Sequence, residues 1–371
     1  MRAKLKAAQP ALDQIFQHHL DQYHIPSLIY AVTLHGEVVF HGSLGNVSVS
    51  PSSPSTRSGN PPSFDSSKFR IASMTKSFTA MAIIQLRDKG LLQLSDPVSK
   101  YVPEVEHMVP LTADCPVLTV GHLLTMQGGL PQDDPWGDRL LDMSDHDFSK
   151  LLTSGLYFSN PIGTVYEYSN LGYSILGLVI KNITKMPYQD YITKHILHPL
   201  GMRNSYFECD KAGIDLVQGY RWEDKQWKEE PMLHDGAFGA MGGIITTMED
   251  FSKYMAFHQA AWPASSEKET RLLEGNSSTG PPLLCRASLR EMHFPWAGDS
   301  IFLEKSKLEK SSSRSIPVAA ASTLTPSAHA KTSLFSGVWS EAYGYGLKSC
   351  RDLSGARWIR HAGGLPGNFS L

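Results

Sequence analysis

The sequence predicts an α+β fold, and three observations along the chain support this. Near the N-terminus, the β-branched runs Ser27–Leu34 and Glu37–Gly42 are joined by a short His-Gly turn, the pattern of a hairpin. From residue 73 to about residue 257, apolar residues recur at helical spacings of three and four. Two strand-like pieces follow at Tyr343–Lys348 and Arg357–His361. We therefore expect strands near both ends and a mainly helical stretch between them.

The composition is that of an ordinary globular protein. The 371 residues are 41% hydrophobic and 19% charged, and the formal net charge is −2. This balance gives no field that would attract a polyanion, so we expect neither a nucleic-acid partner nor a membrane partner. The N-terminus leads into an amphipathic helix pattern at Leu12–Leu20, and no run reaches the ~18 apolar residues of a membrane span. We expect a cytoplasmic protein, and the oligomeric state stays unknown.

Cysteine and histidine spacing predicts neither disulfides nor a metal. Cys115, Cys209, Cys285 and Cys350 show no paired spacing, which favours free thiols. The closest histidine pairs lack the His-Glu-x-x-His arrangement of a zinc site. We therefore expect no cofactor.

Two segments are predicted to be flexible inserts. Residues 49–64 are rich in Ser and Pro and show no periodicity. Residues 263–338 contain Ser-rich and Lys-rich tracts that cannot form a core.

Ser73 and Lys76 are the first candidates for chemistry. Residues at i and i+3 share a helix face, so the Lys76 amine would lie beside the Ser73 hydroxyl and could remove its proton. The alternative is an exposed helix-capping serine with a solvated lysine. The same spacing recurs at Ser265 and Lys268 in a polar stretch, whereas Ser73 precedes the apolar run 78–86, which predicts burial. The spacing alone leaves both readings open.

Two further motifs stand in the order that one family requires. They are Tyr168-Ser169-Asn170 and His361-Ala362-Gly363, the second followed by Gly364. Together with Ser73-x-x-Lys76, they resemble the three signature elements of the penicillin-recognising serine hydrolases: class C β-lactamases, penicillin-binding proteins, DD-peptidases and the related esterases and transesterases. The resemblance covers residues 12–369 apart from the two inserts.

The resemblance implies a role for each matched residue. Ser73 would be the nucleophile, and Lys76 and Tyr168 would share the proton transfers. Asn170, His361, Gly363 and Gly364 would bind the substrate, with the Ser73 N–H and an N–H near Gly364 as donors to the oxyanion. Taken alone, Tyr168 could be a packed aromatic, Asn170 a turn residue and His361 a surface histidine. The triplet Lys331-Thr332-Ser333 mimics the third motif, but it precedes the strand that the family's motif follows.

The implied fold is a β-lactamase/transpeptidase-like α+β domain, with an antiparallel sheet, flanking helices and a mainly helical subdomain. We expect one catalytic domain over 1–371, with the sheet subdomain at 12–48 and 339–371 and the helical subdomain at 65–262. Because the family's later strands and C-terminal helix would follow His361, we expect the domain to be C-terminally truncated.

The implied function is a serine hydrolase that acts on small ester, amide or lactam substrates through an acyl-enzyme on Ser73. One alternative is an acyltransferase, a transesterase of secondary metabolism that uses the same intermediate. Another is a truncated, catalytically impaired member that acts as a binding or scaffold protein. His361 stands where many members have lysine, which lowers the fixed positive charge and favours neutral esters or amides.

Overall fold

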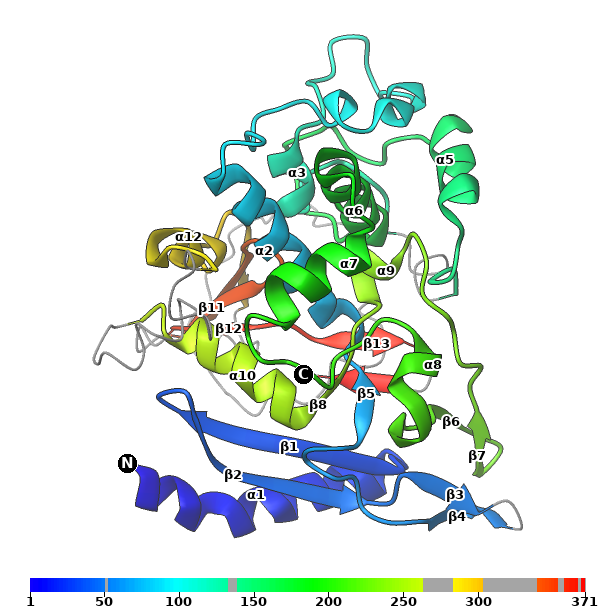
Figure 1. Ribbon diagram of the computed structural model, residues 1–371, viewed down its shortest axis with the longest axis vertical. Coiled ribbons are helices and arrows are strands. Elements are labelled where there is room, and N and C mark those ends of the chain that lie inside the picture. Colours follow the sequence, from blue (N-terminus) through cyan, green and yellow to red (C-terminus); the bar gives the residue numbers. More distant parts are fainter. Residues whose placement is uncertain are drawn as a thin grey trace, which may run out of the picture.

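The computed structural model describes residues 1–50, 53–132, 139–262, 283–302, 339–352, 357–365 and 368–370. It confirms the α+β class, with most of the helices gathered in one part and the N-terminal hairpin in another (Figure 1). The second Ser-x-x-Lys copy, the Lys331 triplet and most of the insert predicted at 263–338 lie outside the described residues.

The described helices run in chain order as follows: α1 (Arg2–Gln22), α2 (Thr75–Asp88), α3 (Val120–Leu124), α5 (Asp145–Thr153), α6 (Asn170–Thr184), α7 (Tyr188–Ile192), α8 (Cys209–Ala212), α9 (Gly239–Gly242), α10 (Met248–Gln259) and α12 (Arg286–Met292). Short 3₁₀ turns lie at η1 (Ala72–Met74), η2 (Val98–Lys100), η3 (Pro103–His107) and η5 (Gly213–Asp215), and a π-helical turn at η4 (Thr193–Leu197).

The strands are β1 (Ser27–Leu34), β2 (Glu37–Gly45), β3 (Ser48–Ser50), β4 (Ser53–Ser58), β5 (Lys68–Arg70), β6 (Tyr220–Glu223), β7 (Gln226–Glu229), β8 (Ile245–Thr247), β9 (Ala297–Phe302), β10 (Trp339–Tyr343), β11 (Lys348–Asp352), β12 (Arg357–Arg360), β13 (Gly363–Leu365) and β14 (Asn368–Ser370). Strands β9 to β12 form an antiparallel sheet in the order β12-β11-β10-β9. The pairs β1-β2, β3-β4, β5-β8, β6-β7 and β13-β14 are also antiparallel.

The N-terminal hairpin is covered by α1. Strands β1 and β2 confirm the predicted hairpin, and the Tyr30 hydroxyl donates to Asp13 on the helix at 2.6 Å. The helix begins earlier than the predicted Leu12–Leu20 and contains Pro10. Leu5, Leu12 and Phe16 pack against the hairpin's small core, which compensates for the backbone hydrogen bond that proline removes.

Helix α2 lies in the middle of the main core. Every residue from Thr75 to Leu86 is buried, as the apolar run 78–86 predicts. A helix that is buried on all sides belongs to the centre of a domain. Its neighbours include α6, α9 and α12, so a side chain at its N-terminal end is positioned by several elements.

Parts of both predicted inserts are regular structure. Within 49–64, β4 pairs with β3, and Arg57 on β4 donates to the carbonyls of Leu20 and Ile25 at the end of α1. Within 263–338, the described residues include α12 and β9. The described pieces of both segments thus form strands and a helix, and the flexibility expected of the inserts stays a prediction.

The stretch Tyr343–Lys348 is a turn and not the predicted strand. Strand β10 ends at Tyr343 and β11 begins at Lys348, with Gly344 and Gly346 between them. Gly346 has φ +69°, and a Cβ there would lie 2.6 Å from the Lys76 carbonyl oxygen. This turn therefore packs directly on the start of α2.

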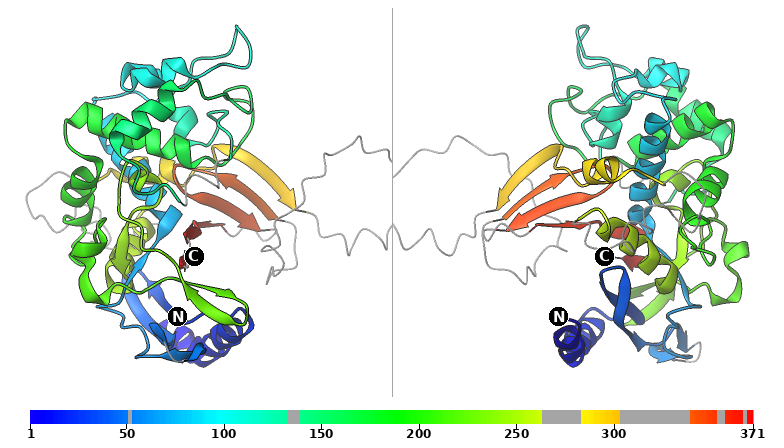
Figure 2. Two further views of the ribbon diagram at one scale, coloured as in Figure 1. Left: turned by 90° about the vertical axis from the view of Figure 1, so that its right-hand side faces the viewer. Right: turned by 60° about the vertical axis from the view of Figure 1, so that its left-hand side comes forward.

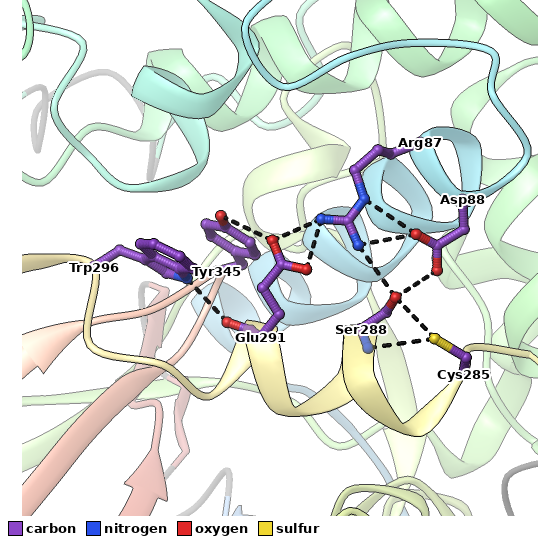
Figure 3. A network of polar contacts seen from close by, with 7 residues as sticks. All are labelled: Arg87, Asp88, Cys285, Ser288, Glu291, Trp296 and Tyr345. Atoms are coloured by element: carbon purple, nitrogen blue, oxygen red, sulfur yellow. Dashed lines mark hydrogen bonds and ion pairs between the residues drawn. The ribbon is translucent and has the colours of Figure 1, made fainter.

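The far end of α2 is tied to α12 by a polar network (Figure 3). Arg87 donates to both carboxylate oxygens of Glu291, at 2.6 and 2.7 Å, and Tyr345 donates to Glu291 at 3.4 Å. The sheet β9–β12 stands beside the helices, and β13–β14 lies between this sheet and the hairpin (Figure 2). The start of α2 thus contacts the turn between β10 and β11, and its end contacts α12.

All four cysteines are free. In the described part of the chain, no helix has both the length and the apolar character needed to cross a bilayer.

Candidate active site

Ser73 lies in a clamped turn at the N-terminal end of α2. Ala72, just before it, has φ 47°, a left-handed conformation that costs an alanine ~1–3 kcal/mol. Ile71 N donates to Ile244 O at 3.0 Å, and Ile244 N donates to the Thr75 hydroxyl at 3.2 Å. These two bonds hold the turn on both sides of Ser73 and offset its strain.

The Lys76 ammonium group is fully buried beside Ser73. Its Nζ donates to Ser73 Oγ at 3.1 Å, to Asn170 Oδ1 at 2.7 Å and to the Met241 carbonyl at 2.9 Å. A buried amine needs such acceptors, because an unpaired one would be strongly destabilising. Two of the acceptors, the amide oxygen and the carbonyl, can only accept, whereas the Ser73 hydroxyl can also donate. In its neutral form the amine can therefore keep both fixed bonds and point its lone pair at Ser73.

Tyr168 and Asn170 reach the site from the start of α6. The Ser169 hydroxyl accepts from Gly172 N and caps this helix, which fixes the direction of the residues on either side. Asn170 is buried, and Tyr168 is half-buried with its ring centroid 4.9 Å from Lys76 Nζ. The structure thus brings Ser73, Lys76, Tyr168 and Asn170 together.

His361 closes the opposite side of the site, just after β12. It is buried, and its ring centroid lies 6.4 Å from that of Tyr168. Desolvation, with a smaller contribution from the positive charge of Lys76, lowers the pKa of His361 to about 3. The imidazole is therefore neutral at neutral pH.

Gly363 and Gly364 belong to β13, which runs alongside η1 and the Ser73 turn. Gly363 is buried, whereas Gly364 is exposed and has open space where a Cβ would point. Strand β13 therefore lies next to the turn that carries Ser73.

Two groups that contact the site residues, the Met241 carbonyl and the Tyr343 hydroxyl, lie outside the three sequence motifs. The Met241 carbonyl belongs to α9, in the glycine-rich bend Gly239–Gly243. The backbones pack closely there, since a Cβ at Gly177 on α6 would lie 2.6 Å from Ala240 Cβ. Tyr343 is fully buried, and its hydroxyl lies 3.4 Å from His361 Nε2. The cluster of glycines around Met241 is a sequence signal for a close backbone contact, whereas no sequence signal indicates the contact of Tyr343 with His361.

The large described cavity, of about 1240 Å³, adjoins the site, since Met74, Ser77 and His361 line it. Its walls come from the hairpin turn, α10, α12, β11 and β12, and include Trp262, Trp296 and Trp358. Of the predicted site residues, His361 lines it and Ser73, Lys76, Tyr168 and Asn170 do not. The cavity lining therefore gives no evidence for the roles of these four residues, and the evidence for them is the set of contacts around Lys76. Among the described residues, no group of three His, Cys, Asp or Glu side chains could hold a metal ion.

A comparison with family models matches residues 12–370 to the family described as Beta-lactamase. The chain belongs to the beta-lactamase family, as its motifs indicated.

Curated relatives agree with this assignment. The chain is 32% identical over 260 residues to Protein flp of Staphylococcus aureus (strain N315), which is 67% of this chain and 49% of that protein. It is 32% identical over 259 residues to Beta-lactamase-like protein 2 of Dictyostelium discoideum, 68% of this chain and 46% of that protein. The chain thus spans under half the length of these relatives.

Solved structures share the fold. The octameric penicillin-binding protein homologue from Pyrococcus abyssi superposes with a TM-score of 0.68 and 22% identity, over 96% of this chain and 68% of that one. The D-alanine carboxypeptidase AmpC from Burkholderia cenocepacia gives a TM-score of 0.63 and 17% identity, over 98% and 88% of the two chains. At these identities the likeness establishes the fold alone.

Proposed function

We propose that this chain is a serine hydrolase that forms an acyl-enzyme on Ser73 with small, uncharged ester, amide or lactam substrates. The observation that carries the proposal is the position of Lys76 Nζ, which bridges Ser73 Oγ, Asn170 Oδ1 and Met241 O in a fully buried setting. An amine held at hydrogen-bond distance from a serine hydroxyl is the requirement for activating that serine.

The proton transfers follow from this geometry. The neutral Lys76 amine accepts the Ser73 proton as the oxygen attacks the substrate carbonyl, and the resulting ammonium stays bonded to its two fixed acceptors. Tyr168, whose ring lies beside Lys76 Nζ, passes a proton to the leaving group. Water then releases the acyl group by the reverse transfers. Backbone donors near Ser73 and Gly364 hold the oxyanion, and each is worth about 3 kcal/mol.

The preference for uncharged substrates follows from the opposite wall. His361 is buried and neutral, because desolvation lowers the pKa of its imidazole to about 3. It supplies no positive charge to a substrate carboxylate, and an unpaired carboxylate is costly to bury. Lys76 is fully buried, and its Nζ is already bonded to Ser73 Oγ, Asn170 Oδ1 and Met241 O.

A matched pair of esters tests the proposal. The mono-4-nitrophenyl ester of glutaric acid carries a carboxylate, and its methyl ester differs only in that this charge is capped. We expect the capped ester to have at least ~10-fold higher kcat/KM, since the unpaired carboxylate costs more than ~1.4 kcal/mol. Ser73→Ala is the control, and it should hydrolyse neither ester above background.

Equal rates for the two esters would contradict the substrate preference, and turnover by Ser73→Ala would contradict the nucleophile. Product analysis with an added alcohol measures how the acyl group divides between water and the acceptor. Dominant ester formation would replace hydrolysis by acyl transfer through the same intermediate.

A further inference from the structure

The hydrogen bonds of His361 determine which of its nitrogens carries the proton. Its Nδ1 lies 2.6 Å from the carbonyl oxygen of Ala362. A carbonyl can only accept, so Nδ1 must be protonated. A neutral imidazole then has its lone pair on Nε2, the atom that lies 3.4 Å from the Tyr343 hydroxyl.

The Tyr343 side chain is held in place by burial and ring packing, so its hydroxyl stays close to the Nε2 lone pair. Its side chain is 1% exposed, and its ring meets the His361 ring edge-on, with centroids 6.2 Å apart. Tyr166 packs on its other side at 5.6 Å. The position of the hydroxyl is fixed by β10 and by this aromatic packing.

We propose that Tyr343 is a positioning residue that holds His361 in its neutral, Nδ1-protonated form by donating to Nε2. The wall opposite Lys76 is then neutral. Protonation of Nε2 costs the bond that the Tyr343 hydroxyl donates, because the hydroxyl must turn its proton away before its oxygen can accept from the new N–H.

The charged and titratable groups around His361 come from three elements and one loop. They are Lys76 on α2, Lys348 on β11, Tyr343 on β10 and Tyr168 before α6. Both lysines disfavour a charged imidazole, and Lys348 is paired with Glu341 at 2.6 Å. Removing the Tyr343 hydroxyl leaves these charges in place, so its effect can be measured separately from theirs.

The direct test is nitrogen NMR of the ¹⁵N-histidine-labelled full chain, with the His361 signals assigned by their loss in His361→Gln. We expect a protonated Nδ1 and an unprotonated Nε2 from pH 7 down to pH 5. In Tyr343→Phe, we expect the protonation midpoint of His361 to rise by about one pH unit or more. Tyr345→Phe is the matched control, because it removes a buried tyrosine hydroxyl that faces Glu291 and not His361 (Figure 3).

A wild-type His361 protonated on Nε2, or a Tyr343→Phe titration that matches the wild type, would overturn the inference. Should Tyr343→Phe not fold, labelling the wild-type chain with 3-fluorotyrosine provides a second measurement. Its more acidic hydroxyl should move the Nε2 signal of His361, and an unmoved signal would overturn the inference.

The kinetic consequence rests on the proposed function. With the capped glutarate ester, the acid limb of the kcat/KM profile of Tyr343→Phe should lie about one pH unit higher than that of Tyr345→Phe, because a cation forms beside Lys76 at the raised midpoint of His361. An acid limb at the same pH as in Tyr345→Phe would leave Tyr343 with a packing role and overturn the inference. An inactive wild type would contradict the proposed function, while the NMR titration would still decide on Tyr343.

Discussion

The two walls of the candidate site are held in different ways. On the helical wall, groups from η1, α6 and α9 converge on one atom, Lys76 Nζ, at distances between 2.7 and 3.1 Å. On the sheet wall, His361 bonds to its own neighbouring carbonyl and to Tyr343 at 3.4 Å. The helical wall is thus organised around a proton acceptor, whereas the sheet wall presents a neutral side chain and backbone groups.

This difference indicates a division of labour. Proton transfer needs a group fixed within hydrogen-bond reach of the nucleophile, which only the helical wall provides. The sheet wall can shape the acyl pocket and stabilise developing charge through the β13 backbone. Substitutions on the two walls should therefore have effects of different size and kind.

The largest effect is expected from Lys76→Met, which keeps an unbranched side chain in the core but removes the amine. The Ser73 hydroxyl loses its base, so kcat should fall by about 10³-fold or more, equivalent to ~4 kcal/mol. Steady-state hydrolysis of the capped glutarate ester measures this. Lys89→Met, at the exposed end of the same helix, is the control and should retain wild-type activity. Activity of Lys76→Met within tenfold of wild type would break the comparison between the walls.

The next largest effect is expected where the two walls meet, at the turn between β10 and β11 that packs on the start of α2. In Gly346→Ala, the new methyl would lie 2.6 Å from the Lys76 carbonyl oxygen, in a residue with φ +69°. We expect the free energy of unfolding to fall by ~2–4 kcal/mol, since backbone strain and a backbone clash add together.

Gly90→Ala separates these two contributions, because Gly90 has φ +72° and no atom within 4 Å of the added Cβ. It should cost only about 1 kcal/mol. Urea denaturation of both variants gives the values. Equal losses would mean that the turn does not press on α2.

A smaller, pH-dependent effect comes from a second pair of buried histidines, outside the site. His293 Nε2 and His258 Nδ1 are 2.8 Å apart, and Trp262 donates to His293 Nδ1 at 3.0 Å. Burial lowers the pKa of His293 to about 4 and that of His258 well below its ordinary value. Because the folded pKa lies below the unfolded value of ~6.5, stability is present above pH 6.5 and is lost as the pH falls towards 4.

His293→Gln should reduce this loss, because its amide can accept from Trp262 and donate to His258 without titrating. The slope of unfolding free energy against pH between 6 and 4.5 should decrease by up to ~1.4 kcal/mol per pH unit. Desolvation raises the pKa of Asp235 to about 7, so this carboxyl contributes a slope of opposite sign. Its contribution is the same in the wild type and in His293→Gln, and it cancels when the two slopes are compared. Unchanged slopes by urea denaturation would show that His293 is charged in the folded protein.

The helical wall could largely be predicted from the sequence. Ser73 and Lys76 are three residues apart, in the turn η1 and in the helix α2 that directly follows it, and the apolar run behind them indicates burial. Their geometry therefore follows from local spacing in the sequence. The N-terminal hairpin followed from two β-branched runs and a glycine turn for the same reason. Met241 was missed because its backbone carbonyl has no residue-type signature, although the nearby glycines indicated a close approach.

The sheet wall could be predicted only in part. Tyr343–Lys348 was predicted as a strand because its aromatic residues favour strands, whereas Gly344 and Gly346 form the turn between β10 and β11. The contact between Tyr343 and His361 joins residues on different strands, and strand register is a long-range property. Strand β4 was missed because its register depends on Arg57 reaching the end of α1.

The most direct test of the account is the position of the covalent acyl group. After brief reaction with a slowly released 4-nitrophenyl ester or a fluorophosphonate, trypsin should yield the peptide 71–76, Ile-Ala-Ser-Met-Thr-Lys, with the added mass on Ser73. Fragmentation separates Ser73 from Thr75, and Ser73→Ala should give no adduct. An adduct on another residue, or the same labelling in Ser73→Ala, would contradict the assignment of Ser73 as the nucleophile.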